Sequence, residues 1–111
     1  MPPEGGETVE LHAFRGSRRA SVYRAHVVTE AAFARIVESG AGQDLALLAS
    51  LGRSGAHELD KEAARQLAAE ANEIRMSGEL LDLDGDLVAI AELARWCARA
   101  PARAWMRIER L

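Results

Sequence analysis

The chain has 111 residues, of which 49% are hydrophobic and 28% are charged, and its formal net charge is -3 at pH 7. This length suits one domain, and the apolar content is too high for a disordered chain. No apolar run approaches the roughly 18 residues of a membrane-spanning helix, and the composition fits neither collagen nor a disulfide scaffold. We therefore expect a soluble single domain at residues 8–111, preceded by a disordered tail at residues 1–7.

Two segments near the N-terminus predict a β-hairpin. Apolar and polar residues alternate at residues 8–15, and the alternation returns at residues 20–28 after a turn that contains Gly16 and Ser17. A period of two places every second side chain on the same face of a strand. The two segments are therefore expected to form antiparallel strands, each with one apolar face.

Apolar residues spaced three and four apart predict four helices in the middle of the chain. Each predicted helix follows a residue whose side chain can cap its N-terminus: Thr29, Asp44, Asp60 and Asp86. Each is expected to end at a residue that disfavours continued helix: Gly40, Gly52, Gly78 and Pro101. Residues 52–58 are expected to be a loop, and residues 80–83 a turn or a short extra strand.

The order of the elements predicts an α+β fold. Residues 104–111 alternate weakly and are expected to form a third strand. The fold would then have an N-terminal β-hairpin, four helices, a C-terminal strand, and a small antiparallel sheet covered by helices on one face. The apolar positions of the third and fourth helices predict one shared core, which includes Leu67, Ile74, Ile90, Leu93 and Cys97.

Cys97 is the single cysteine, so the chain cannot form an internal disulfide. A lone cysteine in an apolar helical stripe is typical of a buried structural residue in a reducing compartment. The N-terminal segment has neither a basic region nor an apolar run, as a secretory signal would. We therefore expect a cytoplasmic protein.

A group of acidic residues surrounds Gly85 and resembles the start of a calcium-binding loop: Glu79, Asp82, Asp84 and Asp86. Such a loop also needs a glycine at its sixth position and a glutamate at its twelfth. Leu87 and Leu93 stand at those positions. The sequence therefore predicts no metal site here, and nothing in it indicates a cofactor.

His12 and His26 are expected to be neighbours on one face of the hairpin, where two imidazoles could bind a metal. A third ligand is missing, because no histidine or cysteine stands at a metal-binding spacing from them. The alternative function is a small enzyme, or a non-catalytic enzyme subunit, with a pocket near the hairpin histidines. Such a pocket would be lined by His12, His26, Tyr23 or Cys97.

Arginines occur in two groups that could attract phosphate: Arg15, Arg18, Arg19 and Arg24 in the hairpin, and Arg95, Arg99, Arg103 and Arg107 near the C-terminus. The acidic overall balance and the break at Pro101 argue against nucleic-acid binding, and no aromatic stacking platform is evident. A helix C-terminus favours cations, which is a sufficient structural reason for Arg95 and Arg99.

The middle of the chain is strongly acidic, since residues 30–94 hold thirteen acidic and five basic residues, a balance of -8. Acidic surfaces speed association with cationic partners. The residues predicted to bind a basic protein partner lie in two loops that precede helices: Glu58, Asp60, Glu79, Asp82 and Asp84. Capping accounts for Asp60, but local structure offers no role for Glu79, Asp82 and Asp84.

The half of the chain from residue 60 onward combines the capped helix 60–76 with the segments 94–101 and 104–109. In composition and architecture it resembles small bacterial proteins of the immunity or inhibitor type, without a diagnostic motif. A small, acidic, cysteine-poor domain with no catalytic constellation is also the profile expected of an inhibitor or adaptor, so we expect a cytoplasmic protein-binding module that neutralises a cationic partner. A third alternative is a homodimer, in which residues 104–111 form an edge strand that pairs across a two-fold axis.

Overall fold

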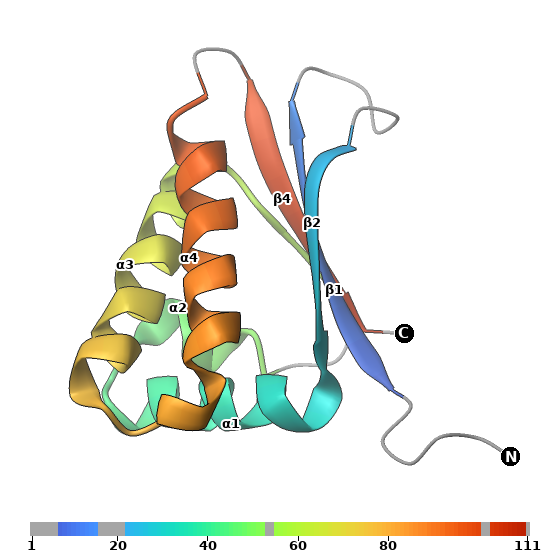
Figure 1. Cartoon of the computed structure of the whole chain (residues 1–111). Helices are drawn as coiled ribbons and strands as arrows, with labels where there is room; N and C mark the ends of the chain where they lie inside the picture. Colours follow the sequence, from blue (N-terminus) through green and yellow to red (C-terminus); the bar gives the residue numbers. More distant parts are fainter. Residues whose placement is uncertain (1–6, 16–21, 53–54, 101–102, 111) are drawn as a thin grey trace, which may run out of the picture.

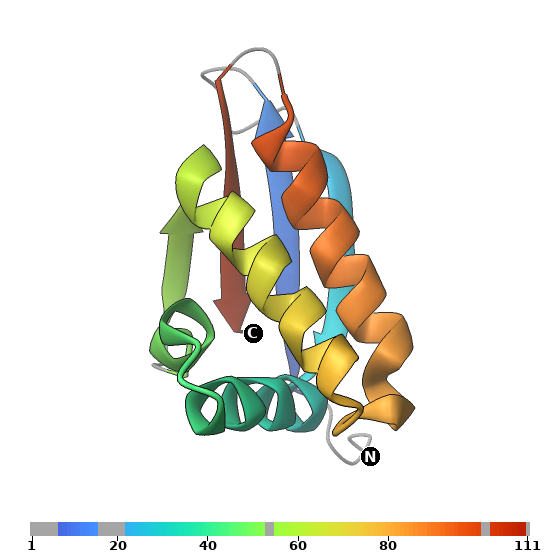
Figure 2. The same cartoon turned by 90° about the vertical axis from the view of Figure 1, so that its left-hand side faces the viewer.

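The fold is that of a computed structural model, which describes residues 7–15, 22–52, 55–100 and 103–110. Its strands are β1 (Thr8–Arg15), β2 (Val22–Thr29), β3 (Ala56–Leu59) and β4 (Ala104–Arg110). Its helices are α1 (Glu30–Gly42), α2 (Ala46–Ser50), α3 (Lys61–Ser77) and α4 (Asp84–Ala98), and a 3-10 turn, η1 (Leu81–Leu83), precedes α4. The strands form an antiparallel sheet in the order β2-β1-β4-β3, with the helices on one face (Figure 1, Figure 2). The predicted α+β fold is confirmed.

The predicted N-terminal hairpin is also confirmed, and its second strand is described from Val22 onward. β1 and β2 pair in antiparallel fashion, with an irregularity in the register between Ala13 and Phe14. The predicted turn at residues 16–19, most of the tail at residues 1–7 and the helix breaker Pro101 lie outside the described residues.

Strand β4 lies in the middle of the sheet and not at its edge. It pairs with β1 on one side and with β3 on the other, so the predicted route to a homodimer through an exposed edge at residues 104–111 is wrong.

β3 itself replaces part of the loop expected at residues 52–58. Its burial pattern leaves only Leu59 buried, so these four residues lack the apolar alternation that would have predicted a strand.

Helix α1 begins as predicted but continues two residues past Gly40. The Thr29 side chain accepts a hydrogen bond from the backbone N–H of Ala32, at 3.1 Å. Gly40 is buried, and a Cβ atom at this position would lie 2.6 Å from Cβ of Leu48. The glycine therefore allows α2 to approach α1 closely, and ending the helix is not its role.

A buried carboxylate from α3, and not the predicted cap Asp44, satisfies the start of α2. The N-cap position is Leu45, which makes no side-chain capping bond. Glu70 accepts hydrogen bonds from the backbone N–H groups of Leu47 and Leu48, at 3.2 and 2.8 Å. Glu70 is only 6% exposed. Its charge is thus held at the positive end of a neighbouring helix, where it accepts from amides that have no partner within that helix.

Helix α3 has the boundaries that the sequence predicts. The Asp60 side chain accepts a hydrogen bond from the N–H of Ala63 at 2.8 Å and so caps the first turn. The helix ends at Ser77, and Gly78 follows with a φ of 75°, a left-handed conformation that favours glycine. These two signals fix both ends of the longest helix.

Helix α4 starts three residues earlier than expected. The 3-10 turn η1 leads directly into Asp84, so Leu83 is the N-cap and Asp86 lies inside the first turn. Asp86 therefore does not cap the helix, and residues 80–83 do not form a strand. α3 and α4 then run antiparallel, side by side across the sheet, as a helical hairpin (Figure 2).

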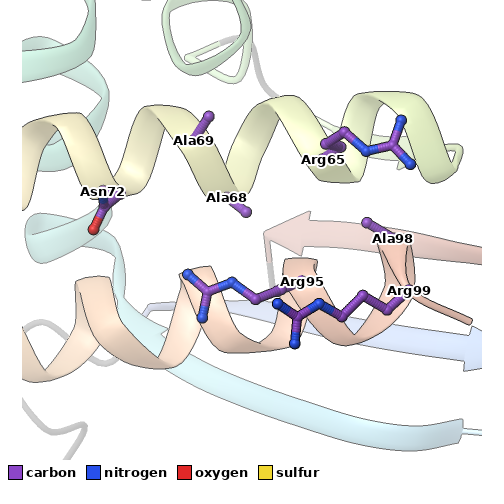
Figure 3. A pocket seen from close by; sticks show the side chains of 7 residues that line it. All are labelled: Arg65, Ala68, Ala69, Asn72, Arg95, Ala98 and Arg99. Atoms are coloured by element: carbon purple, nitrogen blue, oxygen red, sulfur yellow. The ribbon is translucent and has the colours of Figure 1, made fainter.

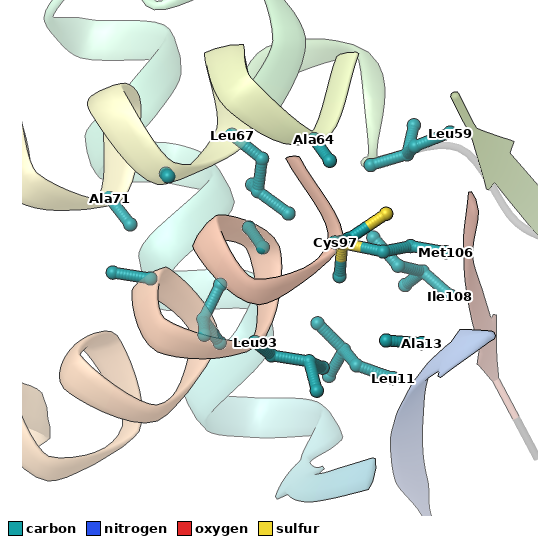
Figure 4. Packing of buried hydrophobic residues seen from close by; sticks show 14 of the residues in the cluster. Leu11, Ala13, Leu59, Ala64, Leu67, Ala71, Leu93, Cys97, Met106 and Ile108 are labelled. Atoms are coloured by element: carbon teal, nitrogen blue, oxygen red, sulfur yellow. The ribbon is translucent and has the colours of Figure 1, made fainter. Parts of the chain in front are cut away.

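The core lies between this helical hairpin and the inner face of the sheet. The predicted core residues are all buried: Leu67, Ile74, Ile90, Leu93 and Cys97. They pack in one cluster with inner-face residues of the sheet, among them Leu11 and Met106 (Figure 4). On the opposite face of the sheet, Phe14 stacks on Trp105 with ring centroids 4.1 Å apart.

Candidate functional site

The turn between α3 and α4 carries three of the five predicted partner-binding residues: Glu79, Asp82 and Asp84. We call residues 76–84 the acidic turn. Gly78 reverses the chain after α3, and η1 carries it into α4 without a long loop. The fold therefore gathers these carboxylates at one end of the helical hairpin.

Asp82 is held by an arginine from α1. The Arg35 guanidinium donates two hydrogen bonds to the Asp82 carboxylate, at 2.6 and 3.1 Å. This hydrogen bonding lowers the pKa of Asp82 below its usual value and raises the pKa of Arg35. The pair keeps the carboxylate charged and in one orientation.

Asp84 and Glu79 also have partners inside the molecule. Arg75 donates to Asp84 at 2.9 Å, while Glu79 accepts from the Ser39 hydroxyl at 2.8 Å and from the Gln43 amide at 3.0 Å. The expectation that these acidic residues have no local role is therefore wrong. They tie the acidic turn to the last turn of α3 and to the end of α1.

Beside the acidic turn lies an open hollow of about 430 Å³, lined by Arg35, Glu38, Ser39, Glu79 and Leu80. Glu38 and Glu79 make no ion pair with any other described residue. Met76 and Leu81, both in the turn, are 80% and 76% exposed, more than any other large hydrophobic side chain that the structure describes. The turn therefore combines negative charge with exposed apolar surface.

Glu58 and Asp60, the other two predicted residues, lie elsewhere. Glu58 is on β3 and Asp60 caps the start of α3. Helix α3 has 17 residues, which places about 25 Å between its ends. The five predicted residues therefore do not form one surface.

The residues considered for an enzyme site are separated by the fold. His12 lies opposite Ala25 and His26 opposite Leu11, so the two imidazoles are on opposite faces of the sheet, and the prediction that they are neighbours is wrong. His26 contacts Asp86 of α4 at 3.0 Å. Cys97 is fully buried, as predicted, and burial raises its pKa, so its thiol is protonated at neutral pH.

A second charged surface lies at the other end of the helical hairpin, and we call it the arginine surface: Arg15, Arg24, Arg65, Arg95 and Arg99, with Trp96. One hollow, of about 310 Å³, lies between α3 and α4 and has an alanine floor that includes Ala68 and Ala98 (Figure 3). A second hollow, of about 320 Å³, lies on the sheet side of α4. Arg95 and Arg99 line both, so they form a ridge between the two hollows.

Trp96 connects this ridge to the hairpin strands. The Arg15 guanidinium lies 4.0 Å from the centroid of the Trp96 ring, and that of Arg24 lies 5.7 Å away. Both distances are within the range of cation–π attraction. Arg24, Arg95 and Arg99 make no ion pair with any other described residue.

The convergence of these arginines was missed from the sequence. Both groups were visible there, since Arg95 and Arg99 are one helical turn apart and Arg15 and Arg24 flank the hairpin turn. Their meeting depends on α4 packing across β1 and β2, a contact between segments about 80 residues apart in the chain. No local pattern reports such a contact.

Comparison with protein families, with curated proteins and with solved structures gives no significant match. Within the described ranges, no three histidine, cysteine or acidic side chains are placed to hold a metal ion. No helix among them combines the length and the apolar character that crossing a membrane requires. The function therefore has to be inferred from the two charged surfaces.

Proposed function

We propose that the protein is a small cytoplasmic protein-binding module that recognises a basic protein through the acidic turn. The observation that carries this proposal is the pair of exposed apolar side chains, Met76 and Leu81, set among Glu79, Asp82 and Asp84. Protein interfaces combine a central apolar contact with a polar rim, and methionine is enriched in them. An inhibitor or immunity role, in which binding blocks the partner, is the form of this function that we favour.

The internal partners of the acidic residues support recognition because they reduce the cost of ordering the turn. Asp82 is oriented by Arg35, and Asp84 by Arg75. Side chains that are already fixed lose less conformational entropy on binding. Glu79, without an ion pair to a described residue, adds unbalanced negative charge that attracts a cationic surface.

The test begins with affinity capture from the native host, followed by measurement of association with the captured protein at several salt concentrations. Replacing Glu79, Asp82 and Asp84 by Gln, Asn and Asn should slow association about tenfold at low salt and flatten its salt dependence. Met76→Ser with Leu81→Ser should instead speed dissociation, because buried apolar contacts act mainly on that rate.

A matched control replaces three carboxylates that lie outside the turn, on β3, α3 and β4: Glu58, Glu62 and Glu109, each by Gln. This variant has the same net charge as the acidic-turn variant, and it should associate nearly as fast as the wild type because salt screens distant charges. If both triple variants behave alike, or if neither acidic-turn variant changes the rates, the partner does not bind at the acidic turn.

A further inference from the structure

We propose that the arginine surface is a binding site for phosphoryl groups, with Arg95 and Arg99 as its centre. The site lies at the opposite end of the helical hairpin from the acidic turn, so it is independent of the function proposed above. Three observations support it: the guanidiniums gathered there, the two hollows that share one ridge, and the half-buried indole of Trp96.

Arg24, Arg95 and Arg99 at this surface differ from the arginines that are ion-paired within the chain. In several places elsewhere in the molecule, one guanidinium is paired with one carboxylate, as in Arg35–Asp82, Arg75–Asp84 and Arg110–Glu30. A fork of two N–H donors matches the two oxygens of a carboxylate. Arg35 binds Asp82 through two nitrogens in this way, and Arg75 and Arg110 each reach their carboxylate through Nε, so all three have an anionic partner inside the chain.

At the arginine surface Arg65 is paired with Glu62, but three other guanidiniums are not paired in this way. Arg24, Arg95 and Arg99 are exposed and make no ion pair with a described residue, although Glu92 also lines the second hollow. A phosphoryl group carries up to about two negative charges and offers three acceptor oxygens. It can therefore accept from several guanidiniums at once, with more charge and one more acceptor oxygen than a single carboxylate.

The shape of the surface indicates how such a ligand would lie. Arg95 and Arg99 extend in the same direction along α4, one turn apart, and Arg65 lines the first hollow from α3 with its side chain extending the opposite way (Figure 3). Each hollow is at the small end of the range for ligand sites. A ligand with adjacent phosphoryl groups could place one in each hollow and cross the ridge between them.

Ligand binding should also stabilise the fold. Like charges one turn apart on a helix repel each other, so Arg95 and Arg99 are held together at a cost in free energy. An anion bound between them removes this repulsion, and any ligand that binds only the folded chain shifts the unfolding equilibrium toward it. The melting temperature is thus a second readout of binding.

The experiment uses the full chain with Trp105→Phe, which preserves an aromatic ring against Phe14 and leaves Trp96 as the only tryptophan. Two probes are titrated, sodium tripolyphosphate and a single-stranded oligonucleotide, while Trp96 fluorescence and melting temperature are followed. We expect saturable binding of at least one probe, weakened about tenfold for each arginine removed in Arg95→Gln and Arg99→Gln. Binding by both probes or by tripolyphosphate alone assigns free phosphoryl groups, and binding by the oligonucleotide alone assigns a nucleic-acid backbone.

The matched control is Arg35→Gln with Arg75→Gln, which lowers the net charge by the same amount at the acidic turn. It should bind both probes within about twofold of the wild-type affinity, since salt at 0.15 M screens charges beyond about 8 Å. Arg24→Gln provides an independent variant if the variant with both Arg95→Gln and Arg99→Gln fails to fold. The proposal is overturned if neither probe binds, or if a glutamate-rich peptide binds where both phosphate probes fail. It is also overturned if the control variant loses as much affinity as the variant with both Arg95→Gln and Arg99→Gln.

Discussion

At the acidic turn, each aspartate lies beside one arginine from the same chain, whereas at the arginine surface the guanidiniums of Arg24, Arg95 and Arg99 have no ion pair among the described residues. Both ends belong to the same helical hairpin and both are exposed to solvent. The difference shows that charged residues clustered in a sequence can have either of two roles in the fold. Opposite charges that the fold brings together stabilise and orient the chain, and like charges that it brings together remain available to a ligand.

The largest effect on stability should come from a change in the core of the helical hairpin, between the acidic turn and the arginine surface. Leu67 is buried on α3, midway between the two ends. Leu67→Ala should lower the free energy of unfolding by about 2–5 kcal/mol. Urea unfolding measures this loss. Asn72→Ala, an exposed change on the same helix, should stay within about 0.5 kcal/mol. Similar values for the two variants would mean that the hairpin does not depend on this core.

An intermediate effect is expected at Glu70, which is neither exposed nor paired with an arginine. Glu70→Ala leaves the N–H groups of Leu47 and Leu48 without their acceptor, which should cost about 1–3 kcal/mol. Hydrogen exchange at those two amides should rise more than elsewhere, because α2 loses its cap. Unchanged exchange there would show that α2 is held by its apolar contacts alone.

The smallest effect concerns Asp82, whose folded-state pKa lies below its unfolded value because of Arg35. Its contribution to stability is therefore complete above the unfolded pKa and is lost as the pH falls through the folded pKa. Arg35→Gln should raise the pKa of Asp82 toward its usual value, as carboxyl chemical shifts would report. Arg75→Gln, which removes the neighbouring arginine, should leave the pKa of Asp82 nearly unchanged. An equal shift in both variants would mean that the overall charge of the turn, and not the contact with Arg35, sets the pKa of Asp82.

The parts of the fold that were predictable are those with strong local signals. The apolar alternation of β1 marked a strand, and Asp60 and Gly78 marked both ends of α3. β3 was missed because its four residues are ordered by pairing with β4 and not by their own pattern. Asp86 was misread as a cap because η1 leads into the helix three residues before the position that a side-chain cap at Asp86 would give.

The candidate site was less predictable for the same physical reason. The sequence located the acidic turn, because Glu79, Asp82 and Asp84 are neighbours along the chain. It could not reveal that Arg35 reaches Asp82 from 47 positions away, or that Trp96 lies beneath Arg15. Both contacts follow from how helices pack on the sheet, which local composition does not encode.

The central position of β4 has a consequence for how the protein is made. Val9 of β1 lies opposite Arg110 of β4, and β3 reaches the sheet only through β4. During synthesis from the N-terminus, the hairpin and β3 therefore stay unconnected until residues 104–110 have left the ribosome. Pairing over so long a sequence separation is slow because the loop entropy is lost before the contacts form. Until then, the edge of β1 that pairs with β4 would be exposed on the nascent chain, and an unpaired strand edge favours aggregation.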